Sequence, residues 1–311
     1  RDSYFENITI LGPWTTGSTI SEDTTTTTSI GLSLNSKNGG VESVRNEFTN
    51  CHIQGWAYGV VSDWDINDNV FTTSNFGVLG YGVAFGKSMV VDGNTSNGTA
   101  TGPHNNIFSD CVFTNISRQA LLISEGTYNV SRGNKFVTCG NDGGADSLPV
   151  YSVIKFDKLG NESINDFFTR TKALSYQQEN LESVIYIPEV EGDCNFEWGF
   201  EHQVTISDGL GVPLFRLPSI ENQGFVIDYL AVSEEGYNGV RSGTLELVVN
   251  DRDDVGNGTP GISISDEYTY KGDNSYLDTI ALTAVLLDIN ADTDFDTILV
   301  RTDSVQMSAN S

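Results

Sequence analysis

The chain of 311 residues carries 42 Asp and Glu against 16 Lys and Arg, which gives a formal net charge of −26. A surface this acidic repels phosphate backbones and anionic lipid, so nucleic-acid binding and membrane-surface binding are excluded. No apolar stretch approaches the ~20 residues of a membrane-spanning helix, so we expect no membrane insertion. The abundance of Gly, Thr, Asn and Val favours strands and turns over helices.

A repeated motif occupies the first half of the chain. A Phe is followed by an apolar or small residue three positions on, and usually by an apolar residue five positions on. The copies begin at Phe5, Phe48, Phe71, Phe108 and Phe136. The spacings are 43, 23, 37 and 28 residues, and the long intervals contain the runs Thr24–Thr28 and Asp92–Gly102. Rungs of 23 to 28 residues with extruded loops predict a solenoid.

Stacking of such rungs about 4.8 Å apart places equivalent residues in columns. The predicted phenylalanine column contains Phe48, Phe71, Phe108 and Phe136. The predicted column of small residues contains Cys51, Ser74, Cys111 and Cys139. The predicted column of turn asparagines contains Asn46, Asn69, Asn106 and Asn134. The pattern favours a parallel β-helix with buried, reduced cysteines over antiparallel strands that share a motif by chance.

Carboxylates and aromatic residues gather in turns between the apolar segments. Asp63, Asp65 and Asp68 are the candidate catalytic residues, because glycoside hydrolysis requires two carboxylates beside the scissile bond. The alternative is a solvated acidic turn anchored by a Trp. The candidate glycan-binding residues are Trp56, Tyr58, Trp64 and Tyr81, whose flat rings can stack on sugars.

The composition changes at Gly140–Ser147, which we take as the end of the repeat. Residues 148–223 form an intermediate β-rich region, and residues 224–311 contain regularly spaced strands separated by acidic turns. The predicted fold is therefore all-β. A right-handed parallel β-helix over residues 1–147 is followed at the C-terminus by an antiparallel, jelly-roll-like β-sandwich, which we favour over a barrel.

An acidic segment near the C-terminus alternates oxygen-bearing side chains at every second position. The candidate metal ligands are Asp288, Asn290, Asp292, Asp294 and Asp296. The segment begins like an EF-hand loop but has Thr293 at the sixth place and Leu299 at the twelfth, so an EF-hand is excluded. A looser Ca²⁺ site and a solvated acidic hairpin both remain open, and no cofactor is required.

The rungs, followed by Phe225–Tyr229, Gly243–Leu247 and Ser265–Thr269, resemble bacteriophage tail fibre and tailspike proteins, most of all those of phages that infect aquatic bacteria. The resemblance implies a homotrimer that is assembled in the host cytoplasm, located on the virion tail, and in contact with other tail or baseplate proteins. It also implies adsorption to the host through a surface polysaccharide or lipopolysaccharide, with weak contacts multiplied by three-fold valency.

Two other functions remain open at this point. One is a polysaccharide depolymerase, a hydrolase or lyase that acts on host surface polysaccharide through Asp63, Asp65 and Asp68. The other is a structural tail connector without receptor contact. The sequence leans away from an enzyme, because the paired acidic and basic motifs of pectin-cleaving β-helices are absent.

Overall fold

The computed structural model describes residues 2–14, 29–34, 43–62, 66–86, 102–124, 126–141, 151–158, 160–171, 173, 183–186, 195–201, 211–219, 224–232, 239–249, 262–272, 280–287 and 297–302. The chain divides into two compact units, which we describe separately. The first contains Arg1–Ala173 and Val184–His202, and the second contains Leu174–Ser183 and Gln203–Ser311. Within the described ranges there is no helix long and apolar enough to cross a membrane.

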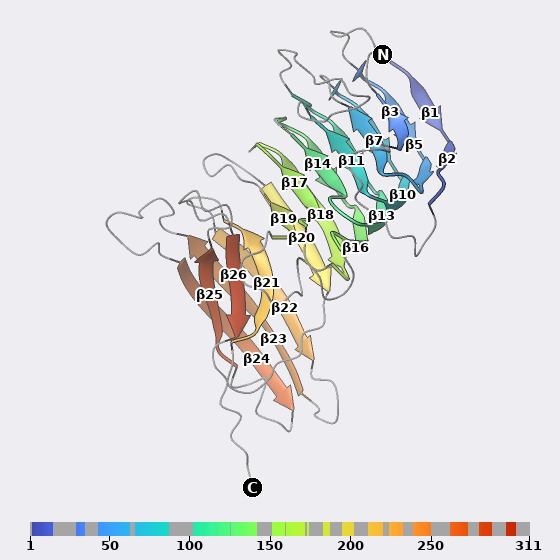
Figure 1. The fold of residues 1–311 in the computed structure, drawn as a ribbon. Helices are drawn as coiled ribbons and strands as arrows, with labels where there is room; N and C mark the ends of the chain where they lie inside the picture. The colour runs from blue at the N-terminus through green and yellow to red at the C-terminus, as the bar shows by residue number, and fades with distance from the viewer. Residues whose placement is uncertain are drawn as a thin grey trace. The chain divides into compact units, whose positions relative to one another are not determined.

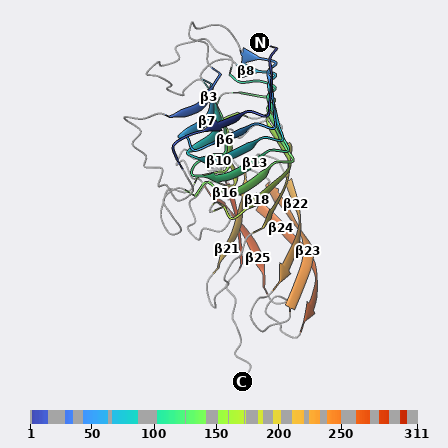
Figure 2. The same ribbon diagram turned by 90° about the vertical axis from the view of Figure 1, so that its right-hand side faces the viewer.

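The first unit is a parallel β-helix, in which every described strand pair is parallel (Figures 1 and 2). Its twelve-stranded sheet consists of β1 (Tyr4–Glu6), β2 (Thr9–Leu11), β5 (Glu47–Thr49), β6 (His52–Gln54), β9 (Val70–Thr72), β10 (Asn75–Leu79), β12 (Ile107–Ser109), β13 (Val112–Ile116), β15 (Val130–Arg132), β16 (Lys135–Cys139), β18 (Glu162–Thr169) and β20 (Asn195–Glu201). The strand order is β1-β5-β9-β12-β15-β18-β16-β13-β10-β6-β2, and β20 pairs with β18. Two rows of short strands are thus joined where the longer β18 pairs with both β15 and β16.

A six-stranded sheet forms a further wall of the same unit. Its strands, in the spatial order β19-β17-β14-β11-β7-β3, are β3 (Ile30–Ser33), β7 (Tyr58–Ser62), β11 (Tyr81–Phe85), β14 (Leu121–Ile123), β17 (Ile154–Phe156) and β19 (Ile185–Tyr186). We call this sheet the six-stranded wall. The short strands β4 (Ser43–Val44) and β8 (Ile66–Asn67) pair beside the main sheets.

Left-handed backbone at one corner explains the polar residues that recur there. The corner between the two strand rows is occupied in successive rungs by Asn7, Asn50, Thr73, Asp110 and Gly133, with φ between 49° and 64°. Asn, Asp and Gly adopt this conformation at lower cost than other residues. The corner between the two strand rows therefore favours Asn, Asp or Gly at this position, although Thr73 also occupies it.

The core contains two phenylalanine ladders where the sequence predicted one. Phe5, Phe48, Phe71 and Phe108 stack with ring centroids 4.8, 4.6 and 5.3 Å apart. The prediction for Phe136 is wrong, because the register partner of Phe108 is Ser131. The second ladder, with centroid distances of 4.6, 4.9 and 5.0 Å, contains Phe76, Phe113, Phe136 and Phe168.

The asparagine column is confirmed at three of its four predicted positions. Its members are Asn46, Asn69, Asn106, Asn129 and Asn161. Each side-chain amide donates to the next Oδ1, at 2.8, 3.0, 2.9 and 2.9 Å. Asn129 takes the place predicted for Asn134, since the rung that follows Asn106 is 23 residues long rather than 28.

The structure also corrects the fourth position of the predicted column of small residues. The backbone N–H of Cys111 donates to Asn134 Oδ1 at 2.8 Å, and that of Asn134 donates to Asp166 Oδ1 at 2.8 Å. The column therefore runs Cys51, Ser74, Cys111, Asn134 and Asp166. Cys139 pairs with Ile116 instead. Cys51, Cys111 and Cys139 are buried and free of disulfide bonds, as predicted.

The β-helix extends beyond residue 147, where the sequence placed its end. Strands β17, β18, β19 and β20, which lie within the predicted intermediate region, belong to the two parallel sheets. Strand β17, which follows the change in composition at residues 140–147, belongs to the six-stranded wall, so this change is not the end of the β-helix.

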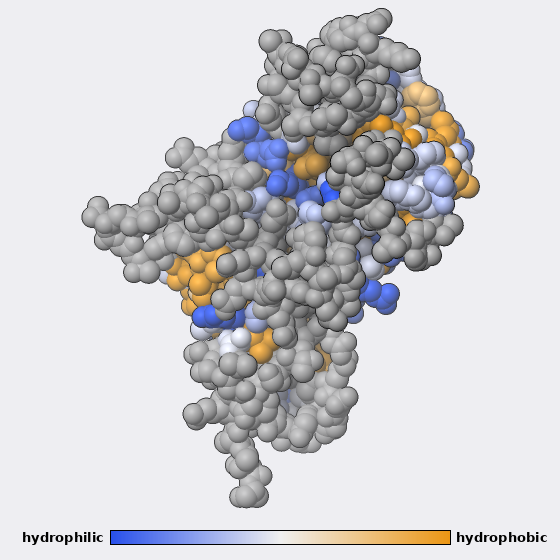
Figure 3. All heavy atoms as spheres, in the orientation of Figure 1, coloured by the Kyte–Doolittle hydropathy of each residue, from blue (hydrophilic) through white to orange (hydrophobic). Residues whose placement is uncertain are grey.

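The first rung leaves the end of this core partly exposed. Phe5 and Ile10 are half-buried and Ile8 is 37% exposed, whereas Phe48 and Ile53 in the next rung are buried. An apolar cavity of about 110 Å³ lies here. Figure 3 shows hydrophobic residues at the surface on the side where Figure 1 places β1 and β2. The core residues of the first rung are thus incompletely buried, because this rung has a described neighbour on one side only.

The second unit contains two three-stranded antiparallel sheets. One has the order β22 (Gly224–Val232), β23 (Gly239–Val249), β24 (Ile262–Gly272), and the other has β21 (Pro213–Pro218), β26 (Thr297–Thr302), β25 (Leu282–Leu287). Strands β22 and β23 alternate between exposed and more buried residues, as expected for a sheet that packs one face on a core. Antiparallel sheets after a β-helix match the predicted fold class, while the jelly-roll connectivity stays a prediction.

Candidate functional site

The six-stranded wall brings together two of the predicted glycan-binding residues. Tyr58 in β7 and Tyr81 in β11 are register partners, and their rings stack with centroids 4.9 Å apart and planes 4° from parallel. Both rings are half-buried and pack against the buried side chains of Val61 and Ala84. Burial raises the pKa of the Tyr58 phenol, so this hydroxyl stays neutral at physiological pH.

A guanidinium continues this column. The backbone N–H of Arg118 donates to the Gly80 carbonyl at 2.9 Å, which places Arg118 beside Tyr81 in the next rung. Arg118 Nη1 donates to the Tyr81 hydroxyl at 2.7 Å. The guanidinium carbon lies 5.3 Å from the ring centroid of Tyr81 and 5.4 Å from that of Tyr151. We call the set Tyr58, Tyr81, Arg118 and Tyr151 the tyrosine–arginine ladder.

A second cation occupies the same wall. Lys155 in β17 is the register partner of Leu122 in β14, and its Nζ lies 4.9 Å from the ring centroid of Tyr186. Among the residues that form the six strands of this wall, Lys155 is the one charged side chain, and none is Asp or Glu. The strands of the twelve-stranded sheet, by contrast, contain Glu6, Glu47, Glu162, Asp166, Glu197 and Glu201.

The stacked arrangement changes how these tyrosines can meet a sugar. The sequence suggested flat rings displayed for stacking. In the structure one face of the Tyr81 ring is covered by Tyr58 and the guanidinium of Arg118 lies near the ring as well. The face of Tyr81 that Tyr58 covers is therefore closed to stacking on a sugar.

The remaining predicted site residues lie elsewhere. Trp56 is half-buried and its Nε1 donates to the Ile10 carbonyl at 3.4 Å. Asp68 is exposed, has a φ of 57°, and accepts a hydrogen bond from Asn105 Nδ2 at 3.2 Å. Asp68 belongs to a second column of left-handed corner residues, so the structure gives it a role in the turn.

Several predicted residues lie outside the described part of the chain. These are Asp63, Trp64, Asp65, Asp288, Asn290, Asp292, Asp294 and Asp296. Among the described residues, no group of three or more His, Cys, Asp or Glu side chains is arranged to hold a metal ion. The catalytic and calcium sites therefore stay predictions.

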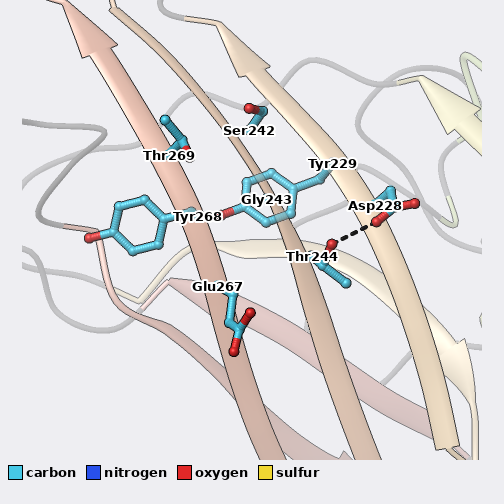
Figure 4. Close-up of a pocket in the computed structure, with 8 residues that line it drawn as sticks. All are labelled: Asp228, Tyr229, Ser242, Gly243, Thr244, Glu267, Tyr268 and Thr269. Carbon is cyan, nitrogen blue, oxygen red and sulfur yellow. Dashed lines mark hydrogen bonds between the residues drawn. The ribbon is translucent and has the colours of Figure 1, made fainter.

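The second unit carries a shallow hollow of about 530 Å³ on the sheet β22–β24 (Figure 4). Its floor is the row of register partners Tyr229, Gly243 and Tyr268. Side chains alternate between the two faces along a strand. The residues in the rows on either side of the floor therefore carry their side chains on the face opposite to the side chains of Tyr229 and Tyr268. These rim residues are Asp228, Ser242, Thr244, Glu267 and Thr269. Hydroxyls and two carboxylates thus surround the hollow.

A buried polar network lies on the other face of the same sheet. Arg241 is 3% exposed, forms an ion pair with Asp266, and donates to the Tyr229 hydroxyl at 2.8 Å and to the Ile280 carbonyl at 2.7 Å. Its guanidinium carbon lies 3.6 Å from the ring centroid of Tyr268. Paired and hydrogen-bonded in this way, the buried charge holds the strands in register and is structural.

Arg118, Tyr151 and Lys155 were not among the site residues predicted from the sequence, although Arg118 could have been found. A signal was present, because Tyr58, Tyr81 and Arg118 are separated by 23 and 37 residues, the same intervals that separate Phe48, Phe71 and Phe108. The phenylalanine spacing thus places Tyr58, Tyr81 and Arg118 in one column, but it does not place Tyr151 or Lys155 there.

No protein-family model and no curated protein matches this sequence. Among solved structures, the chain is similar to the crystal structure of the Acinetobacter baumannii phage AM24 tailspike protein, with 11% sequence identity and a TM-score of 0.16. The match covers 88% of this chain and spans half of the tailspike chain. A score this low carries no weight for fold or function, so the assignment of the parallel β-helix stands on the strand pairing.

Proposed function

We propose that this protein is a tailspike-like or tail-fibre-like subunit of a phage virion that attaches to the host cell by binding a surface glycan. The tyrosine–arginine ladder carries the proposal. It stacks tyrosine residues from successive rungs beside one guanidinium, and an extended polysaccharide likewise repeats similar groups along its length. The segments Phe225–Tyr229, Gly243–Leu247 and Ser265–Thr269, which resemble tail fibre and tailspike proteins, support the same class of protein.

The β-helix wall is preferred to the hollow on β22–β24 as the principal contact surface. The rim of the hollow offers hydroxyls and carboxylates, and the 42% exposed Tyr268 of its floor packs its ring against Arg241, whereas the ladder combines stacked aromatic residues with a hydrogen-bond donor. Assembly as a homotrimer belongs to the proposal. Three copies of a weak site multiply the attachment strength without any new contact.

The test measures binding to purified bacterial surface polysaccharides and to host cells, using the protein and one pair of matched variants. Tyr81→Ala removes a ladder residue, and Tyr4→Ala removes an exposed tyrosine from the twelve-stranded sheet. Tyr81→Ala is expected to weaken binding about tenfold, equivalent to about 1.4 kcal/mol, while Tyr4→Ala leaves it unchanged. Equal binding by both variants would remove the ladder from the site, and failure of the unaltered protein to bind any glycan or cell would refute the function.

A further inference from the structure

We infer that a second glycan contact lies at a corner of the β-helix, where Tyr128 stacks on an uncharged sugar and Asn105 and Asp68 bind its hydroxyl groups. This inference rests on the proposed function, since it requires that the protein bind a surface glycan, and it adds a class of sugar. The three residues belong to a column that shares no member with the tyrosine–arginine ladder.

Left-handed backbone aligns the residues of this column. The backbone N–H of Asp68 donates to the His104 carbonyl at 3.1 Å, and that of Asn105 donates to the Thr127 carbonyl at 3.4 Å, so neighbouring rungs are in register. The exposed members in successive rungs, with φ between 54° and 60°, are Asp2, Arg45, Asp68, Asn105 and Tyr128. We call this set the exposed corner column. Because its members share one backbone conformation, their side chains leave the corner in the same direction, about 4.8 Å apart.

Tyr128 is the unexpected member of the exposed corner column. Asn, Asp and Gly adopt left-handed backbone readily, whereas a bulky aromatic residue does so at an energetic cost. Among the described residues with left-handed backbone, Tyr128 is the one aromatic. Its side chain is 67% exposed, and within the described part of the chain its ring and hydroxyl have no stacking or hydrogen-bonding partner. Neither the turn nor the packing accounts for a tyrosine at this corner, whereas contact with a ligand does.

The neighbouring rung leaves the ring of Tyr128 accessible. Gly160 occupies the next place along the corner, and the backbone N–H of Tyr128 donates to its carbonyl at 2.9 Å. A Cβ atom at Gly160 would lie 3.9 Å from Tyr128 Cε1, so the ring extends beside a residue that has no side chain to cover it. A tyrosine combines a flat apolar face with a polar hydroxyl, and this combination suits a sugar ring, which presents C–H groups on its faces and hydroxyls at its edge.

The polar neighbours of Tyr128 define the class of sugar. Asn105 Nδ2 donates to Asp68 Oδ1 at 3.2 Å, and this contact orients both side chains. Their oxygen atoms can accept sugar hydroxyls, and a hydroxyl forms a strong hydrogen bond with a carboxylate. A carboxylated sugar would instead meet the negative charge of Asp68, because Arg45 is engaged with Asp2 through hydrogen bonds of 2.6 and 3.1 Å. The exposed corner column therefore favours uncharged sugars.

The first experiment measures the binding of the unaltered protein and of Tyr128→Asn to a panel of purified bacterial surface polysaccharides, some uncharged and some carboxylated. The variant should bind an uncharged member about tenfold more weakly. Because Asn adopts left-handed backbone more readily than Tyr, the variant should also unfold at an equal or higher urea concentration. Two controls should bind within about twofold of the unaltered protein. Tyr128→Phe keeps the ring, and Tyr4→Asn removes a tyrosine that is 58% exposed on the twelve-stranded sheet.

The outcomes separate this inference from the proposed function. Undiminished binding by folded Tyr128→Asn, or binding confined to carboxylated members, would overturn the inference and leave the proposed function standing. Absence of binding to every member would overturn both. Asp68→Asn keeps a residue suited to the turn and is expected to narrow the preference for uncharged over carboxylated members. An unchanged preference in that variant would contradict the role assigned to Asp68.

A measurement on the unaltered protein decides the inference even if Tyr128→Asn does not fold. Tetranitromethane nitrates accessible tyrosine rings, and mass mapping gives the extent of nitration at each residue. Saturation with an uncharged polysaccharide from the panel is expected to protect Tyr128 from nitration and to leave the nitration of Tyr4 unchanged. Equal nitration of Tyr128 with and without the bound polysaccharide would show that the ring does not contact the glycan and would overturn the inference.

Discussion

The asparagine column provides the sharpest test of how the β-helix is held together, and Asn106→Ala is the change that interrupts it. Asn106 is fully buried. Its side-chain amide donates to the Ile66 carbonyl at 2.7 Å and to Asn129 Oδ1 at 2.9 Å, and its Oδ1 accepts from the amide and backbone N–H of Asn69 at 3.0 and 3.2 Å. Replacement by Ala removes all four hydrogen bonds.

The expected loss of stability follows from these contacts. Each hydrogen bond contributes about 1 kcal/mol net, and a buried donor left without its acceptor costs about 1–3 kcal/mol. The backbone N–H of Asn69 loses the acceptor it has in the structure. We therefore expect Asn106→Ala to lower the free energy of unfolding by about 3–5 kcal/mol, a large part of the ~5–15 kcal/mol typical of a folded protein.

The assay is urea-induced unfolding of the full chain, followed by circular dichroism, with the reversibility of the transition checked first. Asn75→Ala is the matched control, because Asn75 is exposed in β10 and makes no described side-chain hydrogen bond. The control is expected to change stability by less than about 0.5 kcal/mol. If Asn106→Ala lowers the free energy of unfolding no more than the control does, the asparagine column does not stabilise the β-helix.

Three further predictions concern the columns of the core. Burial raises the pKa of Asp166 above its ordinary 3.8, so the charged carboxylate destabilises the folded state increasingly as the pH rises above that value. Asp166→Asn should therefore raise the urea midpoint at pH 7 and leave it almost unchanged at pH 3. Burial also raises the thiol pKa of both Cys111 and Cys139 to about 12, so neither should be alkylated by iodoacetamide in the native protein at pH 8, and mass mapping of label at either residue would contradict this. Phe113 is fully buried between two stacked rings, so its replacement by Ala should lower the free energy of unfolding by about 3–5 kcal/mol. A decrease below about 1 kcal/mol in the same urea assay would argue against the ladder.

The sequence by itself determined the kind of architecture. The Phe motif recurs with a small residue three positions later, and only stacked rungs place such repeats in one core. The buried, reduced state of Cys51, Cys111 and Cys139 followed from the same pattern. The sequence predicts these features because the alternation of buried and exposed residues in a strand depends only on residues that are neighbours in the sequence.

The tertiary structure alone decided which residues share a column. The aligned rungs differ in length, as the steps from Phe48 to Phe71 and from Phe71 to Phe108 show, and a single sequence does not reveal where each loop leaves the helix. Hydrogen bonds between neighbouring strands set the register. They moved Phe136 and Asn134 from their predicted columns and brought Arg118 beside Tyr81. The candidate site depends on this register, because its residues are far apart in the chain and meet only when the rungs stack.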